Sequence, residues 1–330
     1  MKKRISCFIL ALLMAVVSIS CGKSANNAEL SSKENIFYEL EVSTFMPWES
    51  EEEDIPEGEL ASDDIRREVN NLAKDILGFI NSTYSTEWEY VDKDVFIVEG
   101  TEDYGGGYCH TDGNLYFNKN FVYGNVEKGF QNPKLKNVVV HEVIHAIIDE
   151  NRGTPFFYKW YSEDSVLGGY LHEAVTELLT EEYLRYIGIQ LKDIYSEGMS
   201  SGYAHIVYYL RAMDAAIPGT VNDILCDNMP ELEERVEEKA GNEEAFDRWL
   251  FFLDITQLEY MNCIMNEEDA INPFIMVYAT TEFMEDISDE EVLLKEINNY
   301  FDKAFGSNSG EKYCDTVEEG KEMMWRFVEE

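Results

Sequence analysis

The feature that most constrains the fold is an apolar stretch near the middle of the chain, VVVHEVIHAIIDE at residues 138–150. At 3.6 residues per turn this stretch leaves almost no polar face, and a helix that is apolar all round belongs in a protein core. Its two histidines and its first glutamate would then be buried, which is costly unless other groups satisfy them. The stretch therefore predicts a central helix, ending near Gly153, whose polar side chains need partners.

The two histidines of this stretch have the spacing of a metal site. His141 and His145 are four residues apart, so they project from one helical face one turn apart. Nitrogens held in this way can both reach one zinc ion at about 2.0–2.1 Å. Glu142 lies one residue round the helix, where a carboxylate can contact a metal-bound water without being a ligand. The HExxH pattern thus predicts a zinc site, and the alternative is a pair of core histidines satisfied by hydrogen bonds.

A third protein ligand has to come from another segment. No histidine follows His145 at the spacing of the longer HExxHxxGxxH motif. The segment YLHEAVTELLTEEYLR, residues 170–185, carries Glu173 and Glu177 four residues apart among apolar neighbours. His172 precedes the first of these glutamates but points about 100° away from it on a helix. We therefore expect His172 to lie on the surface or in packing contacts rather than to bind metal.

The two motifs together resemble the gluzincin zinc peptidases, the class that contains thermolysin and many membrane-anchored aminopeptidases. In that class a second helix bears a glutamate ligand, followed four residues later by an acidic residue. The resemblance covers about residues 95–215, and its specific part is confined to the two short motifs. The zinc ligands that it implies are His141, His145 and Glu173. It also implies that Glu177 orients a ligating imidazole.

The gap between the second histidine and Glu173 is longer than in the best-known gluzincins, and a loop around residues 154–169 would fill it. Glu177 as the third ligand is the alternative. The resemblance implies a zinc-dependent peptidase, in which Glu142 takes a proton from the zinc-bound water that attacks the peptide carbonyl. The same glutamate then delivers the proton to the leaving amine.

Gluzincins usually add a tyrosine or histidine that stabilises the developing oxyanion. In SGYAHIVYYLRAM, Tyr203 is the first candidate for this catalytic role and His205 the second. Packing is the alternative for Tyr203, because the chain has twenty tyrosines. Peptidases of this class often hold the substrate along an edge strand, which GGGYCHTDGNLYFN at residues 105–118 could supply. The alternative is an ordinary hairpin with Cys109 and His110 exposed.

Several segments have clear local signals. A helix is expected from Ser62 to about Asn81, because Ser-Asp-Asp is a favourable helix start. Strand character marks residues 94–98 and 114–117. The triplets Gly105-Gly106-Gly107 and Thr111-Asp112-Gly113 are typical of turns. From about residue 163 onward the pattern is helical. The expected class is α+β, with a small mixed N-terminal part containing a short sheet, the zinc-site helices, and a mostly helical C-terminal part, as in a thermolysin-like core.

The N-terminus has the pattern of an export signal. Three basic residues precede an apolar stretch at 8–17 that is short for a membrane span, and small residues then precede Cys21. This resembles a bacterial lipoprotein signal at residues 1–20, with Cys21 as the lipidated N-terminus of the mature protein. The alternative is an ordinary secretory signal cleaved near Ser20. Either signal predicts an extracytoplasmic protein, and lipidation predicts one that is anchored to the outer face of a bacterial membrane by its lipid alone.

Three further segments are expected: an acidic tether at 21–61, a metallopeptidase core at 62–215 and a helical part at 216–330. The formal net charge of −40 argues against electrostatic binding of nucleic acid or anionic lipid. The expected partner is a peptide or protein substrate, and the expected cofactor is one zinc ion. Two alternatives remain open: a non-catalytic zinc-containing binding lipoprotein, and a zinc amidase that acts on a non-peptide amide.

Overall fold

The structure is a computed structural model. The residues that it describes are 57–99, 106–109, 112–119, 122, 133–152, 159–162, 165–190, 204–251, 253–254, 257, 277–278, 280–281, 284–285, 287–304, 310 and 312–329. The expected signal at 1–20, Cys21, nearly all of the expected tether, His110 and Tyr203 lie outside this part of the chain.

A four-stranded sheet forms one side of the molecule. Its strands are β1 (Gly58–Leu60), β2 (Val95–Val98), β3 (Gly106–Cys109) and β4 (Asn114–Asn118). They lie in the order β1-β2-β4-β3, in which only the central pair, β2 and β4, is parallel. The expected strands at 94–98 and 114–117 are both present. Strand β3 lies at one edge of the sheet, next to the helix that follows in the chain.

The glycines before this helix do not all form turns as their sequence suggests. Gly106 and Gly107 lie within β3, where a Cβ atom on Gly106 would lie 2.5 Å from Cδ1 of Phe117. No side chain fits there without displacing the phenylalanine ring. The second predicted turn is present: Gly113 has a φ of +70°, and the Asp112 carboxylate accepts from the Asn114 amide at 3.0 Å. The turn prediction was therefore wrong for Gly106 and Gly107 because close packing, and not a positive φ, requires glycine in β3.

Helix α3 (Asp63–Tyr84) begins as its sequence predicts. The Ser62 hydroxyl accepts a hydrogen bond from the Ile65 amide at 3.4 Å, and two aspartates in the first turn favourably oppose the helix dipole. The helix ends at Tyr84, three residues beyond the expected Asn81, and its C-cap residue Ser85 adopts a left-handed conformation with φ of 57°. The buried face of α3 packs against the central helix and β2.

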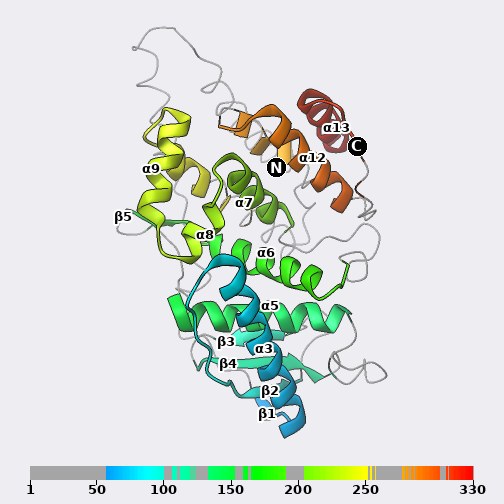
Figure 1. Ribbon diagram of the computed structural model, residues 1–330. Helices are drawn as coiled ribbons and strands as arrows, with labels where there is room; N and C mark the ends of the chain where they lie inside the picture. Colours follow the sequence, from blue (N-terminus) through cyan, green and yellow to red (C-terminus); the bar gives the residue numbers. More distant parts are fainter. Residues whose placement is uncertain are drawn as a thin grey trace, which may run out of the picture.

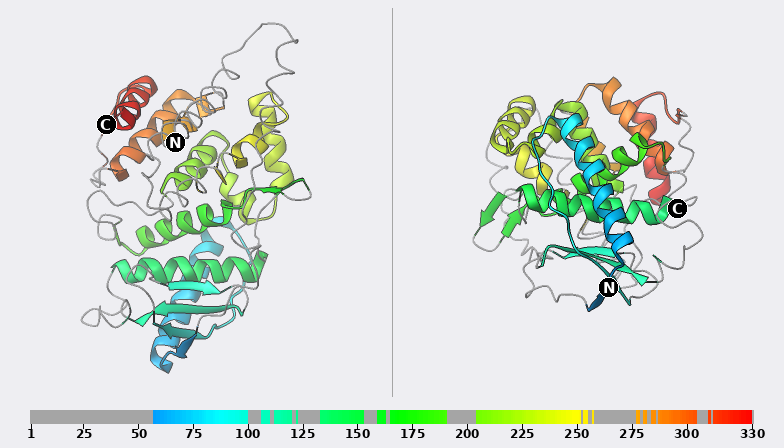
Figure 2. Two further views of the ribbon diagram at one scale, coloured as in Figure 1. Left: turned by 180° about the vertical axis from the view of Figure 1, so that it is seen from behind. Right: turned by 60° about the horizontal axis from the view of Figure 1, so that its bottom comes forward.

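The apolar stretch at 138–150 forms the central part of α5 (Pro133–Arg152), as predicted. Its core residues, none more than 1% exposed, are Leu135, Val139, Val140, Val143, Ile144, Ala146, Ile147 and Ile148. In Figures 1 and 2 the sheet, α5 and α6 (Leu171–Tyr186) form successive layers, and α3 crosses over them. The hairpin of β5 (Lys159–Ser162) and β6 (Ser165–Leu167) lies in the segment expected to be a loop.

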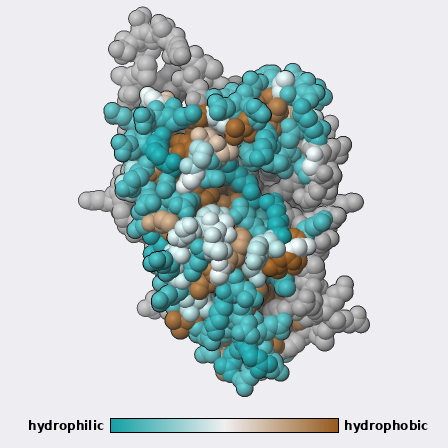
Figure 3. Space-filling view, viewed as in Figure 1, coloured by the Kyte–Doolittle hydropathy of each residue, from teal (hydrophilic) through white to brown (hydrophobic). Residues whose placement is uncertain are grey.

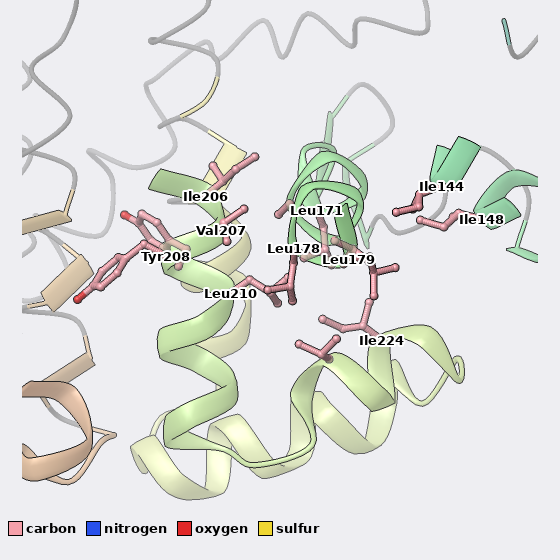
Figure 4. Close-up of a cluster of buried hydrophobic side chains, with 14 of the residues drawn as sticks. Ile144, Ile148, Leu171, Leu178, Leu179, Ile206, Val207, Tyr208, Leu210 and Ile224 are labelled. Carbon is pink, nitrogen blue, oxygen red and sulfur yellow. The ribbon is translucent and has the colours of Figure 1, made fainter. Parts of the chain in front are cut away.

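The remaining described helices pack on the far side of α6. They are α7 (Ala204–Ala216), α8 (Thr220–Leu225), α9 (Met229–Ala240), α12 (Glu290–Ala304) and α13 (Val317–Glu329). Figure 4 shows α6 inside the hydrophobic cluster, with Leu178 and Leu179 between α5 on one side and Leu210 and Ile224 on the other. The predicted α+β class is thus confirmed. The face in Figure 3 is largely hydrophilic, and no helix among the described residues is long and apolar enough to cross a membrane.

Candidate metal centre

The candidate site lies where α5 and α6 pack against each other. Helix α6 is buried on nearly all sides, including at His172, Thr176 and Glu177. Helix α6 lies between α5 and α7, so most of its polar side chains face other helices rather than solvent, and the Glu173 side chain is 28% exposed. The polar groups of the two helices must therefore satisfy one another or a bound ion.

Three potential ligand atoms converge at this contact. The Nε2 atoms of His141 and His145 are 3.0 Å apart. Oε2 of Glu173 lies 3.4 Å from Nε2 of His141 and 3.3 Å from Nε2 of His145. These three residues form a group that could hold a metal ion. The two histidines of the HExxH motif on α5 and the first glutamate of α6 thus lie close together in space, as the sequence predicts.

Two observations indicate that these three ligand atoms fit a zinc ion. Ligands at about 2.0–2.1 Å in a tetrahedron are about 3.3 Å apart, and the three separations here are close to that value. In addition, Oε2 of Glu173 is buried and makes no well-directed hydrogen bond among the described residues, although it lies within ion-pair distance of both imidazole nitrogens. A buried carboxylate oxygen without a donor is unfavourable unless a cation compensates its charge. Two nitrogens and one oxygen are donors that zinc accepts.

Glu177 contacts the other side of the His141 ring. Its Oε2 atom lies 3.0 Å from Nδ1 of His141, and the Glu177 side chain is only 2% exposed. The carboxylate therefore accepts the Nδ1–H proton, so in the neutral ring, which is the form that binds a metal, the lone pair of Nε2 is directed toward Glu173 and His145. This geometry agrees with Glu173 rather than Glu177 as a member of the potential ligand group, and the orienting role of Glu177 stays a prediction.

His172 also contacts a histidine of α5, which sequence reasoning did not predict. Its Nε2 atom lies 2.8 Å from Nδ1 of His145, and the residue is 8% exposed. His172 is not part of the group of three ligand atoms, as expected, and of the two expected positions, surface or packing, it takes the buried one. His172 points about 100° away from Glu173 around α6. Its ring still faces the ring of His145, because α5 packs directly against α6.

The charges of the site favour a cation between the two helices. Burial opposes protonation of His141, but hydrogen bonding to Glu173 and Glu177 and the charge of Glu142 raise its pKa well above the ordinary histidine value. Burial likewise opposes ionisation of Glu173, but the charge of His145 and the proximity of His141 hold its pKa well below the ordinary value. In the metal-free protein His141 thus supplies positive charge beside these carboxylates.

Glu142 lies between α5 and the edge strand. Its Oε2 atom accepts a hydrogen bond from the amide of Tyr108 at 2.9 Å. The amide of Tyr108 therefore points away from β4 and toward this carboxylate, on the side of β3 that has no neighbouring strand among the described residues. The hydroxyl of Tyr108 donates to Asp149 of α5 at 2.6 Å, which fixes the strand to the helix at a second point. The predicted edge strand is therefore present, directly beside the predicted base.

A second feature that sequence reasoning missed is Asp254, which fixes the start of α6. Its carboxylate accepts from the amides of Gly168, Gly169 and Tyr170 at 2.6, 3.2 and 2.9 Å. Tyr170, the N-cap residue, supplies no side-chain cap of its own. Burial raises the pKa of Asp254 to about 7, against the opposing effect of these three amides. Asp254 thereby anchors the first turn of α6, which carries Glu173.

The candidates for an oxyanion-stabilising residue are not brought into the site by the described residues. Tyr203 lies outside them and immediately precedes α7. His205 lies in the first turn of α7, and its side chain is not described. Both therefore stay predictions.

Comparisons with known proteins add no family to this picture: no protein-family model matches the chain, and neither a curated protein nor a solved structure matches it.

Proposed function

We propose that the protein is a zinc-dependent peptidase. The observation that carries the proposal is the convergence of two imidazole nitrogens and the buried Oε2 of Glu173, which makes no well-directed hydrogen bond, with Glu142 on the adjacent position of α5. His141, His145 and Glu173 would hold the ion, and Glu177 would orient His141. The thermolysin-like arrangement of the catalytic core is part of the proposal and rests on the two motifs.

Zinc, when bound, supplies a Lewis acid that lowers the pKa of a water and polarises the carbonyl under attack. Glu142 acts as the general base: its carboxylate accepts the proton of the attacking water and returns it to the leaving amine. The amide of Tyr108 holds one carboxylate oxygen of Glu142, so the orientation of the base is fixed by main-chain geometry. Tyr203, or alternatively His205, is proposed to stabilise the oxyanion.

The edge strand favours a peptide over a small non-peptide amide. An extended peptide can pair with a strand edge through its main chain, and among the described strands β3 lies at the edge of its sheet beside Glu142, with the Tyr108 amide on that edge donating to Glu142. A small amide would gain nothing from this edge. We also propose an extracytoplasmic location with a lipid anchor at Cys21, and this part rests on the sequence of the N-terminus alone.

The test is hydrolysis of a peptide library by the zinc-loaded full-length chain and by Glu142→Gln. The variant should keep its zinc and lose turnover by about 10²- to 10⁴-fold, because the base is removed and the ligands stay. Glu150→Gln is the matched control, since Glu150 is an exposed glutamate on the same helix and should leave turnover unchanged.

Retained turnover in Glu142→Gln would remove this residue from the mechanism. A wild-type protein that binds zinc but cleaves no peptide would favour a non-catalytic binding lipoprotein, or a non-peptide amidase if it hydrolyses simple amides.

A further inference from the structure

The two histidines of the site differ in the group that contacts Nδ1, the ring nitrogen on the side away from the potential ligand atoms. Nδ1 of His141 faces a carboxylate, that of Glu177, at 3.0 Å. Nδ1 of His145 faces a second imidazole, that of His172, at 2.8 Å. A carboxylate can only accept a hydrogen bond, whereas a neutral imidazole has one donor and one acceptor nitrogen. The hydrogen bond between His145 and His172 can therefore run in either direction. The hydrogen bond between His141 and Glu177 can run in one direction only, from His141 to the carboxylate.

Only one of these arrangements allows His145 to bind a metal through Nε2. A neutral histidine carries a single ring proton. If His145 donates from Nδ1 to Nε2 of His172, its own Nε2 presents a lone pair toward His141 and Glu173. If His172 donates instead, the proton of His145 sits on Nε2 and occupies the place of the ion.

The site already contains several negative charges, so a neutral hydrogen-bond acceptor at Nδ1 of His145 is more favourable than a further carboxylate. Glu142, Glu173 and Glu177 all lie around the two ligating imidazoles. A fourth carboxylate on Nδ1 of His145 would add another buried charge, with its desolvation cost. An imidazole at this point accepts the proton of His145 and adds no charge.

We propose that His172 is a positioning residue for the metal centre: it accepts the Nδ1–H of His145 and so sets the tautomer that exposes Nε2 to the ion. The proposal rests on the metal site of the proposed function, but not on the reaction. One turn of α6 thus supplies both a ligand, Glu173, and the group that prepares another ligand. Such outer partners of metal-bound histidines typically change metal affinity by about 10- to 100-fold when removed.

A second polar atom near Nδ1 of His145 is the hydroxyl oxygen of Thr176. It lies 3.4 Å away, farther than Nε2 of His172. Thr176 is fully buried, and the hydroxyl of Thr180 donates to its main-chain oxygen. Thr176→Val keeps the shape of this side chain and removes its hydroxyl. It therefore provides a matched control for loss of a polar contact at the same nitrogen.

The experiment measures zinc affinity of the full-length chain by competition with a chromophoric chelator. In His172→Gln, the amide oxygen can occupy the place of Nε2 and accept the hydrogen bond, so affinity should stay within a few-fold of wild type. In His172→Leu, no acceptor remains, and affinity should fall about 10- to 100-fold. Thr176→Val should stay within a few-fold. Circular dichroism and thermal unfolding of the metal-free proteins establish that each variant is folded.

A direct measurement on the wild-type protein does not depend on the folding of any variant. The chain has five histidines, so ¹⁵N-histidine labelling gives a small set of ring signals. In the zinc-loaded protein, the Nε2 signal of His172 should be that of an unprotonated acceptor, and Nδ1 of His145 should carry the proton. A proton on Nε2 of His172 would overturn the proposal.

Equal zinc affinity of His172→Leu and wild type would also overturn the proposal. An equal loss of zinc affinity in the glutamine and leucine variants would overturn it too, because it would indicate that His172 contributes packing alone. These outcomes are distinct from failure of the proposed function. Absence of zinc binding by the wild-type chain would contradict the proposed function itself. Tight wild-type binding without peptide hydrolysis would leave the role of His172 intact.

Discussion

Replacing each glutamate of α6 in turn separates the ligand from the residue that orients a ligand. Oε2 of Glu173 faces Nε2 of both histidines at 3.3–3.4 Å, whereas Oε2 of Glu177 faces Nδ1 of His141 at 3.0 Å. Glu173→Ala should therefore remove a bond to the ion, and Glu177→Ala should remove a hydrogen bond to one ligand. Zinc affinity should fall much more in the first variant than in the second.

The magnitudes follow from the roles. Protein zinc sites with four ligands bind with apparent free energies of about 10–16 kcal/mol, so an equal share per ligand corresponds to about 70- to 900-fold in affinity. Loss of an orienting partner typically weakens binding by about 10- to 100-fold. Glu177→Gln should lose less than Glu177→Ala, because the amide oxygen still accepts the Nδ1–H of His141.

Competition with a chromophoric chelator measures both affinities, and unfolding of the metal-free variants provides the control. Glu177→Ala leaves the buried Nδ1–H of His141 without its acceptor, which should cost about 1–3 kcal/mol of unfolding free energy. If Glu177→Ala weakens zinc binding more than Glu173→Ala does, the third ligand is Glu177 and the assignment made from the distances is wrong.

Two further predictions concern the supports of the site. Because the pKa of Asp254 is raised to about 7, the folded state keeps a proton that the unfolded chain loses above pH 4. Its contribution to the unfolding free energy should thus fall between pH 5 and 7 by up to about 1.4 kcal/mol per pH unit. Urea unfolding of the metal-free wild type and of Asp254→Asn measures this contribution. The prediction is refuted if the unfolding free energies of the two proteins change with pH in the same way. Gly106→Ala should destabilise the protein by about 1–3 kcal/mol through its clash with Phe117, and unchanged thermal unfolding would contradict the close packing of β3.

The sequence predicts those parts of the site that depend on local periodicity. His141 and His145 share a helix face because they are four residues apart, and Glu173 and Glu177 do so for the same reason. The burial of α5 follows from its lack of a polar face. The α+β class follows from strand patterns that precede a long helical region.

The remaining parts depend on contacts between distant segments. The helical angle between His172 and Glu173 is known from the sequence, but the position of α5 relative to that turn is not. Asp254 is 84 residues from Tyr170, and nothing around it in the sequence indicates a cap for α6. Gly106 resembles a turn residue until the ring of Phe117 is placed against it.

The measurement that tests the central claim most directly is the metal content of the purified full-length chain, beside His141→Ala and Glu173→Ala. The account predicts about one zinc ion per chain in the wild-type protein and loss of that ion in both variants. A well-folded wild-type protein that contains no zinc, even after supplementation, would contradict it. The HEVIH segment would then be a core helix whose histidines are satisfied by neighbouring side chains, among them Glu177, His172 and Glu173.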